Sequence, residues 1–249
     1  MAVFSAPEHA LEALVLGGAV ALIAGVIRGI TGFGGAMVMA PPLALLLGPR
    51  IAVPVTLLLE GIAAMPMLWH TRDLVRWRAI GPILAAACVT LPLGGYALVM
   101  ADALTLRRAI AAAVIVCALL LLSGWRHRGP PRLGTSVGLG GLSGAMTGAT
   151  SVGAPPVILY LLSGSDPVAT TRANLTFYLV GLSLAGLVML WTRDVLDLRS
   201  ASAALVFAPG YFCGLFAGTR LFSRFNDVRF RQFTLLLLVS VSLGILLLD

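Results

Sequence analysis

Long uncharged segments dominate this chain and constrain its fold more than any other feature. A helix that crosses a bilayer needs about 20 mostly apolar residues, and many segments close to that length carry no charged side chain. One further apolar segment, residues 51–69, is interrupted only by Glu60. The pattern predicts an all-α, polytopic membrane protein. The uncharged segments are residues 13–27, 29–49, 79–100, 109–125, 133–165, 173–192, 200–219 and 232–248.

The composition excludes a soluble globular fold. Hydrophobic residues make up 59% of the 249 residues and charged residues only 11%, whereas a soluble domain carries about 25% charged residues. The mean hydropathy is +1.00. The connections between apolar segments are too short to hold a soluble domain, so residues 1–249 are predicted to form a single membrane domain.

The charge pattern indicates a lipid bilayer rather than nucleic acid as the partner. All 17 basic residues are arginines, which give a net charge of +7 and lie mainly between the apolar segments, as the positive-inside rule requires. The first of them is Arg28, so the cationic region of a cleavable signal peptide is missing and the first apolar segment is expected to be retained. Isolated cysteines and scattered histidines predict no metal site and no cofactor.

Two apolar segments combine a glycine cluster with a proline pair. Residues 25–48 contain Pro41 and Pro42 after their glycines, and residues 144–164 contain Pro155 and Pro156. Glycine frees the backbone, while proline removes a donor and clashes with the preceding turn. Each segment is therefore predicted to form two short helices joined by irregular backbone.

These two segments also align with each other, which indicates a tandem duplication. Gly25, Gly29 and Gly34 match Gly144, Gly148 and Gly153 at a constant offset, since 144 − 25 and 153 − 34 both equal 119. The motif LWHTRD at residues 68–73 matches LWTRD at residues 190–194. We predict a first repeat at residues 1–125, a linker at 126–132 and a second repeat at 133–249.

The arginines distinguish between parallel and inverted repeats. If each broken segment crosses the membrane once, the 16 arginines other than Arg28 divide evenly. If each broken segment enters and returns, as a re-entrant hairpin or as two short crossings, 11 lie on one side and five on the other. The positive-inside rule favours the second arrangement, with inverted repeats and both termini outside. The 11 are Arg72, Arg76, Arg78, Arg126, Arg128, Arg132, Arg172, Arg220, Arg224, Arg229 and Arg231.

Inverted repeats with interrupted helices are typical of transporters whose substrate binds where the breaks meet. Exposed N–H groups and helix N-termini favour an anion there, although glycines can also serve close helix packing alone. The predicted substrate-binding residues are Arg28, Thr31, Gly32, Gly34, Gly35, Thr150, Ser151, Gly153 and Asn174.

Two charged residues lie within these apolar segments, and each has two interpretations. Arg28 either contacts an anion or a carboxylate within the membrane, or ends a helix and reaches outward to the interface. Glu60 either carries a coupling proton or forms a static ion pair with Arg28. The second repeat has an apolar residue near the position equivalent to Glu60, around Val180, so the site need not be symmetric.

The sequence does not indicate an enzyme. Gly141 to Gly144 reads Gly-Leu-Ser-Gly, which fits the serine motif of rhomboid-type intramembrane proteases. Such a serine needs a histidine on a later membrane helix as its base, and no histidine follows His127.

Several motifs resemble the sulfite exporter TauE/SafE family of membrane permeases. The first repeat reads Gly32-Phe33-Gly34-Gly35 with Pro41 after it, and the second copy, from Ser151 to Pro156, has lost glycines. Residues 171–175 and 214–224 also look similar to the family, so the resemblance covers nearly the whole chain. It implies export of sulfite, an organosulfonate or a related oxidised-sulfur or organic anion across the bacterial cytoplasmic membrane.

The predicted function is therefore secondary transport of a small anion, with or without proton coupling. A passive anion channel and a non-transporting membrane scaffold are the alternatives. Dependence of flux on a proton gradient distinguishes the permease from a passive channel, and absence of anion binding indicates a scaffold. The sequence leaves open the substrate, the direction of transport and whether the protein forms a homo-oligomer.

Overall fold

The computed structural model describes residues 7–123, 132–164, 166–221, 239 and 242–243. The first half of the chain contains α1 (Pro7–Thr31), α2 (Gly35–Leu47), α3 (Pro49–Thr71), the short 3-10 helix η1 (Arg72–Leu74), α4 (Trp77–Met100) and α5 (Ala103–Leu122). The second contains α6 (Leu133–Thr150), α7 (Pro155–Leu162), α8 (Val168–Thr192) and α9 (Leu198–Leu221). The predicted linker up to residue 131 and the apolar segment 232–248 fall largely outside the described residues.

The described part of the chain is an all-α membrane protein, as predicted. Six of its helices are long and apolar enough to cross a bilayer: α1, α3, α4, α5, α8 and α9. Helix α4 is an example of a helix with a lipid-facing surface. Its side chains Val89, Leu93, Tyr96 and Met100 form one exposed apolar stripe. The opposite face of α4 is buried. A helix that is apolar on both faces needs lipid on its outer one.

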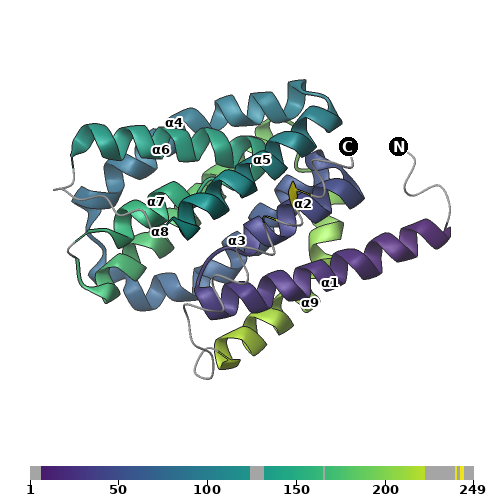
Figure 1. Cartoon of the computed structure of the whole chain (residues 1–249), viewed down its shortest axis with the longest axis horizontal. Coiled ribbons are helices and arrows are strands. Elements are labelled where there is room, and N and C mark those ends of the chain that lie inside the picture. The colour runs from purple at the N-terminus through teal and green to yellow at the C-terminus, as the bar shows by residue number, and fades with distance from the viewer. Residues whose placement is uncertain (1–6, 124–131, 165, 222–238, 240–241, 244–249) are drawn as a thin grey trace.

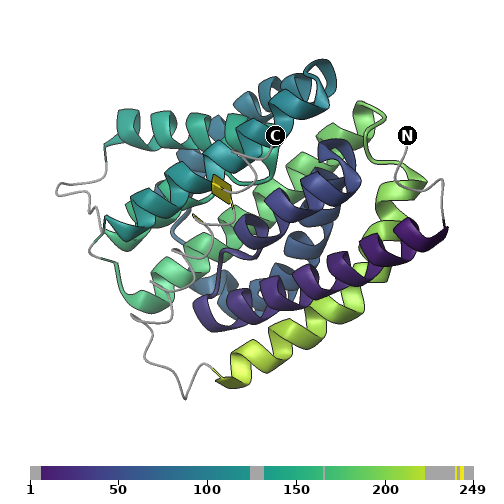
Figure 2. The ribbon, with the colours of Figure 1, turned by 45° about the vertical axis from the view of Figure 1, so that its right-hand side comes forward.

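The helices pair across the two halves of the chain. Figures 1 and 2 show α4 beside α6 along one edge of the molecule and α1 beside α9 along the other. Helices α3 and α8 contact each other between these pairs. Helices of the first half therefore pack mainly against helices of the second half, and the two halves do not form separate bundles.

Glycines allow both edge pairs to approach closely. A Cβ atom on Gly25 of α1 would lie 2.1 Å from the carbonyl oxygen of Tyr211 in α9. A Cβ atom on Gly144 of α6 would lie 2.0 Å from the carbonyl oxygen of Ala87 in α4. Small residues that bring helix backbones together are the usual means of association in membranes. The two matched glycines thus have matched packing roles.

Contacts at the helix ends give the direction of each helix. Arg50 at the start of α3 donates to the carbonyl of Val99 at the end of α4, at 2.5 Å. The backbone N–H of Arg76, before α4, donates to Asn174 near the start of α8, at 2.9 Å. Hence α3 and α4 run in opposite directions, and α8 starts where α4 starts. We call these two ends of the molecule the Arg50 end and the Arg76 end.

Corresponding helices of the two halves run in opposite directions. In the glycine contacts, rising residue numbers in α1 meet rising numbers in α9, and the same holds for α6 and α4. Helices α1, α3 and α9 therefore run from the Arg50 end to the Arg76 end, while α6, α8 and α4 run the other way. This is the arrangement that inverted repeats require; the duplication itself stays a prediction.

The arginines separate by end in the same way. The described members of the larger predicted set lie at helix ends or connections of the Arg76 end: Arg72, Arg76, Arg78, Arg132, Arg172 and Arg220. The five of the smaller set lie at the Arg50 end: Arg50, Arg107, Arg108, Arg193 and Arg199. The two sets of arginines derived from the sequence thus lie at opposite ends of the molecule within the described residues. Which end faces the cytoplasm stays a prediction.

Candidate functional site

Each half contains one helix break, at matching positions. Helix α1 ends at Thr31 and α2 begins at Gly35, while α6 ends at Thr150 and α7 begins at Pro155. Gly32, directly after α1, has a positive φ of 78°. Ser151, which is 119 residues later, adopts the same left-handed conformation with a φ of 59°. Both breaks therefore start with the same backbone turn, which glycine adopts easily and serine only at a cost.

The proline pairs do not make these breaks in the way the sequence suggests. Pro41 and Pro42 lie inside α2, whereas Pro155 and Pro156 are the first two residues of α7. The expectation of two short helices is also wrong for the first member of each pair, because α1 has 25 residues and α6 has 18. Glycine conformation at residues 32 and 34 interrupts the first segment, and proline only initiates the helix that follows the second.

Threonine hydroxyls close both breaks locally. Thr31 Oγ1 donates to the carbonyl of Ile27 at 2.8 Å, and the N–H of Phe33 donates to Thr31 Oγ1 at 3.4 Å. Thr150 Oγ1 donates to the carbonyl of Met146 at 2.7 Å, and the N–H of Val152 donates to it at 3.1 Å. The two threonines thus satisfy backbone groups at the helix ends.

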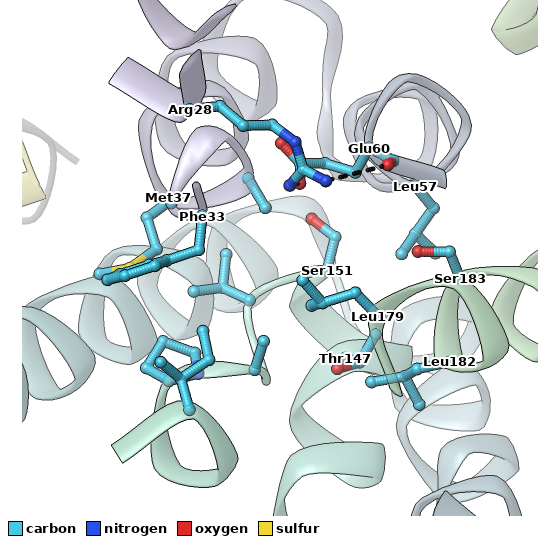
Figure 3. Close-up of a pocket in the computed structure, with 16 residues that line it drawn as sticks. Arg28, Phe33, Met37, Leu57, Glu60, Thr147, Ser151, Leu179, Leu182 and Ser183 are labelled. Carbon is cyan, nitrogen blue, oxygen red and sulfur yellow. Dashed lines mark hydrogen bonds and ion pairs between the residues drawn. The ribbon is translucent and has the colours of Figure 1, made fainter. Parts of the chain in front are cut away.

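The two breaks meet at a small cavity in the membrane domain. Its volume is about 40 Å³, and a single water needs roughly 10–15 Å³ by this measure, so the space suits a solute of a few heavy atoms. Figure 3 shows Phe33 and Met37 on one side and Ser151, Thr147 and Leu182 on the other, with Arg28 and Glu60 near Leu57 and Ser183. The lining comes from α1, α2, α3, α6, α7, α8 and both breaks.

Arg28 and Glu60 form a buried ion pair at the edge of this cavity. Arg28 is 6% exposed and Glu60 is 8% exposed, and the Arg28 guanidinium contacts Glu60 Oε2. Arg28 Nη2 also donates to the Glu60 carbonyl at 3.4 Å. A guanidinium has five N–H donors, so two hydrogen bonds leave further donors for a ligand. Figure 3 shows both side chains reaching toward each other from α1 and α3.

Tyr211 of α9 completes this cluster. Its hydroxyl donates to Glu60 Oε1 at 2.7 Å, and its side chain is fully buried. Gly35 leaves the space that the cluster needs, since a Cβ atom there would lie 2.2 Å from Glu60 Oε1 and 3.1 Å from the Tyr211 hydroxyl. Arg28 of α1 and Tyr211 of α9 therefore hold the Glu60 carboxylate in place, and Gly35 at the start of α2 leaves room for it.

The helix N-termini at the two breaks differ in their capacity to bind an anion. Helix α2 begins with Gly35, Ala36 and Met37, whose N–H groups lie before the first intrahelical bonds. Helix α7 begins with two prolines, which have no N–H. The first free N–H within α7 is therefore that of Val157, so this N-terminus offers fewer donors than α2, and anion binding there stays a prediction.

The structure brings only some of the sequence-predicted site residues to the cavity. Arg28, Gly34, Ser151 and Glu60 line it. The other predicted residues do not line it, although most belong to the breaks beside it: Thr31, Gly32, Gly35, Thr150, Gly153 and Asn174. The hydroxyl of Ser151 donates to the Thr150 carbonyl at 2.5 Å, so it too has a local partner.

Asn174 lies away from the cavity. Its side chain is buried, and its Oδ1 accepts the N–H of Arg76 at 2.9 Å. Arg76 also pairs with Asp166, which precedes α8. Asn174 thus joins the start of α8 to the connection before α4 at the Arg76 end, and its role in substrate binding stays a prediction.

Sequence reasoning missed Tyr211 and Thr147. Tyr211 follows Gly210 in the series Gly210, Gly214 and Gly218, which packs against α1, and that packing could have placed its hydroxyl near Arg28. Thr147 lies at the same 119-residue offset from Arg28 as the aligned glycines, since 147 − 28 equals 119. Between α3 and α8 the offset is larger, since Trp69 matches Trp191 and 191 − 69 equals 122. By this offset, the residue of α8 that corresponds to Glu60 is Leu182 rather than Val180.

Comparison with known proteins agrees with this architecture. The family model described as "Sulfite exporter TauE/SafE" matches residues 17–245, which include both helix breaks and all the cavity-lining residues. No curated protein matches the chain. The chain therefore belongs to the sulfite exporter TauE/SafE family, a family of membrane transporters for sulfur-containing anions rather than enzymes.

Proposed function

We propose that this protein is a secondary permease that exports a small anion across the bacterial cytoplasmic membrane and binds it in the cavity between the two helix breaks. The candidate substrates are sulfite, an organosulfonate or a related oxidised-sulfur or organic anion. The observation that carries this proposal is the buried Arg28–Glu60 pair beside a cavity of about 40 Å³. A cation buried at membrane depth costs free energy, and binding a substrate anion is a function that accounts for its presence there.

The same pair supports proton coupling. While Glu60 is ionised, it neutralises Arg28 and competes with an incoming anion for the guanidinium. Protonation of Glu60 removes that competitor, so one proton and one monovalent anion bind together at no change in the net charge of the site. Release of the proton restores the ion pair and displaces the anion. A static ion pair, the alternative, predicts anion binding that is independent of the charge on residue 60.

Two assays test the proposed function. Purified protein is screened by thermal shift against sulfite, methanesulfonate, thiosulfate and acetate, and at least one anion should raise the melting temperature. Protein in proteoliposomes is then loaded with that anion, and efflux is measured with and without a pH gradient. A proton-coupled permease responds to the gradient, whereas a passive channel gives equal flux in both conditions. A scaffold binds no anion in the first assay, and that result would contradict the proposal.

A further inference from the structure

One residue that lines the cavity has a buried hydroxyl group without a hydrogen-bond partner within the described residues. Four buried side-chain atoms have no hydrogen-bond partner within the described residues, namely Thr56 Oγ1, Thr147 Oγ1, Asn174 Nδ2 and Ser242 Oγ. Of these, Thr147 is the residue that lines the cavity. Thr147 is 3% exposed. A buried polar group without a partner costs free energy, so a group that lines a binding cavity is a candidate to bind the ligand.

The neighbouring hydroxyls differ from Thr147 in this respect. Thr31 and Thr150 bond to the backbone at the breaks, and Ser151 donates to the Thr150 carbonyl. Ser143, one turn before Thr147 in α6, donates to the Gly153 carbonyl and contacts the Tyr178 hydroxyl. These groups already have protein partners, whereas the Thr147 hydroxyl has none within the described residues.

Gly153 leaves the space in which this hydroxyl lies. A Cβ atom on Gly153 would come within 2.2 Å of Thr147 Oγ1. In the first half, Gly35 leaves space for the Glu60 carboxylate in a comparable way, with its Cβ position 2.2 Å from Oε1. The predicted role of Gly153 at the site is therefore indirect: it makes room for a side chain that lines the cavity.

We propose that Thr147 is a substrate-binding residue whose hydroxyl donates a hydrogen bond to the anion that Arg28 attracts. The proposal rests on the anion site described under the proposed function and adds a contact from the second half of the chain. Because Thr147 lies 119 residues after Arg28, the two residues face the cavity from corresponding turns of α1 and α6. One half supplies the charge and the other supplies a neutral donor, so the anion bridges both halves.

The test compares Thr147→Val with the wild type and with Thr147→Ser. Valine keeps the shape and removes the hydroxyl, and serine keeps the hydroxyl. The readouts are the dissociation constants for sulfite and methanesulfonate, and the melting temperature without ligand. Thr147→Val should raise the dissociation constant by at least about tenfold, and Thr147→Ser should retain most of the affinity. The melting temperature of Thr147→Val should stay unchanged or rise, because an unpartnered buried hydroxyl is replaced by an apolar group.

Thr56→Val is the matched control. Thr56 is fully buried and its hydroxyl also has no partner, but it does not line the cavity. Its substitution should leave anion affinity unchanged. Thr147→Ala provides a second variant without the hydroxyl if the valine variant does not fold. Wild-type affinity in the folded variants that lack the hydroxyl would overturn the assignment of Thr147, whereas a wild-type protein that binds none of the four anions screened for the proposed function would overturn the proposed anion site itself.

Discussion

At the residue scale, the buried charged side chains of the described residues, Arg28 and Glu60, lie together. Arg28, Glu60 and Tyr211 come from positions far apart in sequence, and each contacts another of the three. Removing one member of a buried ion pair leaves the other uncompensated, whereas removing both avoids that cost. This difference separates a structural pair from a coupling pair by experiment.

Four proteins test the Arg28–Glu60 pair: the wild type, Arg28→Gln, Glu60→Gln and the double variant. A static pair predicts that Glu60→Gln lowers the free energy of unfolding by about 3–5 kcal/mol and that the double variant recovers it. Proton coupling predicts that Glu60→Gln keeps anion binding and loses the response to a pH gradient. Arg28→Gln should raise the anion dissociation constant in either background. Unchanged melting, binding and gradient response in all four proteins would contradict both roles.

Tyr211→Phe tests how the carboxylate is held. The ionisable side chains that contact Glu60 within the described residues are Arg28 from α1 and Tyr211 from α9; α2 has none, and α8 provides Ser183 nearby. Loss of the hydroxyl leaves Glu60 Oε1 without its donor from α9. The free energy of unfolding should therefore fall by about 1–3 kcal/mol, which thermal unfolding in detergent measures. An unchanged melting temperature would show that the hydrogen bond from Tyr211 does not hold the carboxylate in place.

At the element scale, the two helix breaks determine where the cavity lies. Gly34 caps α2 in the left-handed region with a φ of 91°, and its Cβ position is open, with no atom within 4 Å. Gly153 has the opposite character, because a Cβ atom there would lie 2.1 Å from the Ser143 carbonyl oxygen. Substitutions at these matched glycines should therefore differ in their consequences.

Gly34→Leu should fold and lose transport. The left-handed conformation costs a side chain about 1–2 kcal/mol, and the leucine has open space in the cavity that Gly34 lines. Anion binding should be abolished, while the protein stays inserted and elutes as a single species. Gly18→Leu is the control, since its Cβ position in α1 is also open and Gly18 does not line the cavity. Transport by Gly34→Leu at the wild-type rate would exclude this break from the pathway.

The start of α9 gives a pH dependence of stability. Asp197 Oδ1 accepts the N–H of Ser200 at 2.8 Å, and the Ser200 hydroxyl accepts the N–H of Asp197 at 3.0 Å. The hydrogen bond from the Ser200 backbone lowers the pKa of Asp197 in the folded protein. The stabilisation is therefore fully present above the ordinary aspartate pKa of about 3.9 and is lost as the pH falls through the lowered value.

Asp197→Ala should reduce stability by roughly 1 kcal/mol at neutral pH, and the difference from the wild type should vanish in strong acid. Thermal unfolding in detergent between pH 7 and pH 2 measures both. Asp194→Asn, in the same connection, is the control, since it removes a carboxylate while asparagine tolerates the positive φ of 55° at this position. A deficit of constant size across this range would show that ionised Asp197 does not stabilise the start of α9.

Local patterns predicted the elements but not the long-range contacts. Apolar length predicted the membrane helices, and glycine clusters predicted both breaks, because backbone conformation follows from nearby residues. The Arg28–Glu60 contact was one of two alternatives for Glu60, since buried charges need partners. The Tyr211–Glu60 bond joins residues 151 positions apart, and no local pattern encodes it. Asn174 and Thr31 look available in sequence, but Asn174 Oδ1 accepts the N–H of Arg76 and Thr31 Oγ1 donates to the carbonyl of Ile27.

At the scale of the whole molecule, the opposed directions of corresponding helices relate the two halves. Helices α1 and α6 run oppositely, and so do α3 and α8. Two inverted halves around one site can exchange their roles when the site opens to the other side. The charged pair lies in one half and Thr147 in the other, so such a transition changes the distance between the charge and the neutral donor.

The arginine distribution predicts which end of the molecule faces the cytoplasm. The Arg76 end carries the larger set of arginines, and the positive-inside rule places that set in the cytoplasm. Single cysteines introduced at Asp73 and Asp194, in a chain without Cys88, Cys117 and Cys213, report on the two ends. Both positions are exposed in connections between helices. A membrane-impermeant maleimide added to intact cells should label Asp194→Cys and spare Asp73→Cys.

Permeabilised cells are the control for access, since both cysteines should then react. Labelling of Asp73→Cys in intact cells would reverse the proposed orientation but would leave the opposed helix directions intact. Labelling of both positions in intact cells would contradict the structure, because Asp73 and Asp194 lie at opposite ends of helices that cross the membrane. The orientation also determines from which connections the proposed substrate reaches the site. If the Arg76 end is cytoplasmic, the anion approaches Arg28 past the arginine-rich connections, whose positive charge raises its local concentration before it enters the cavity.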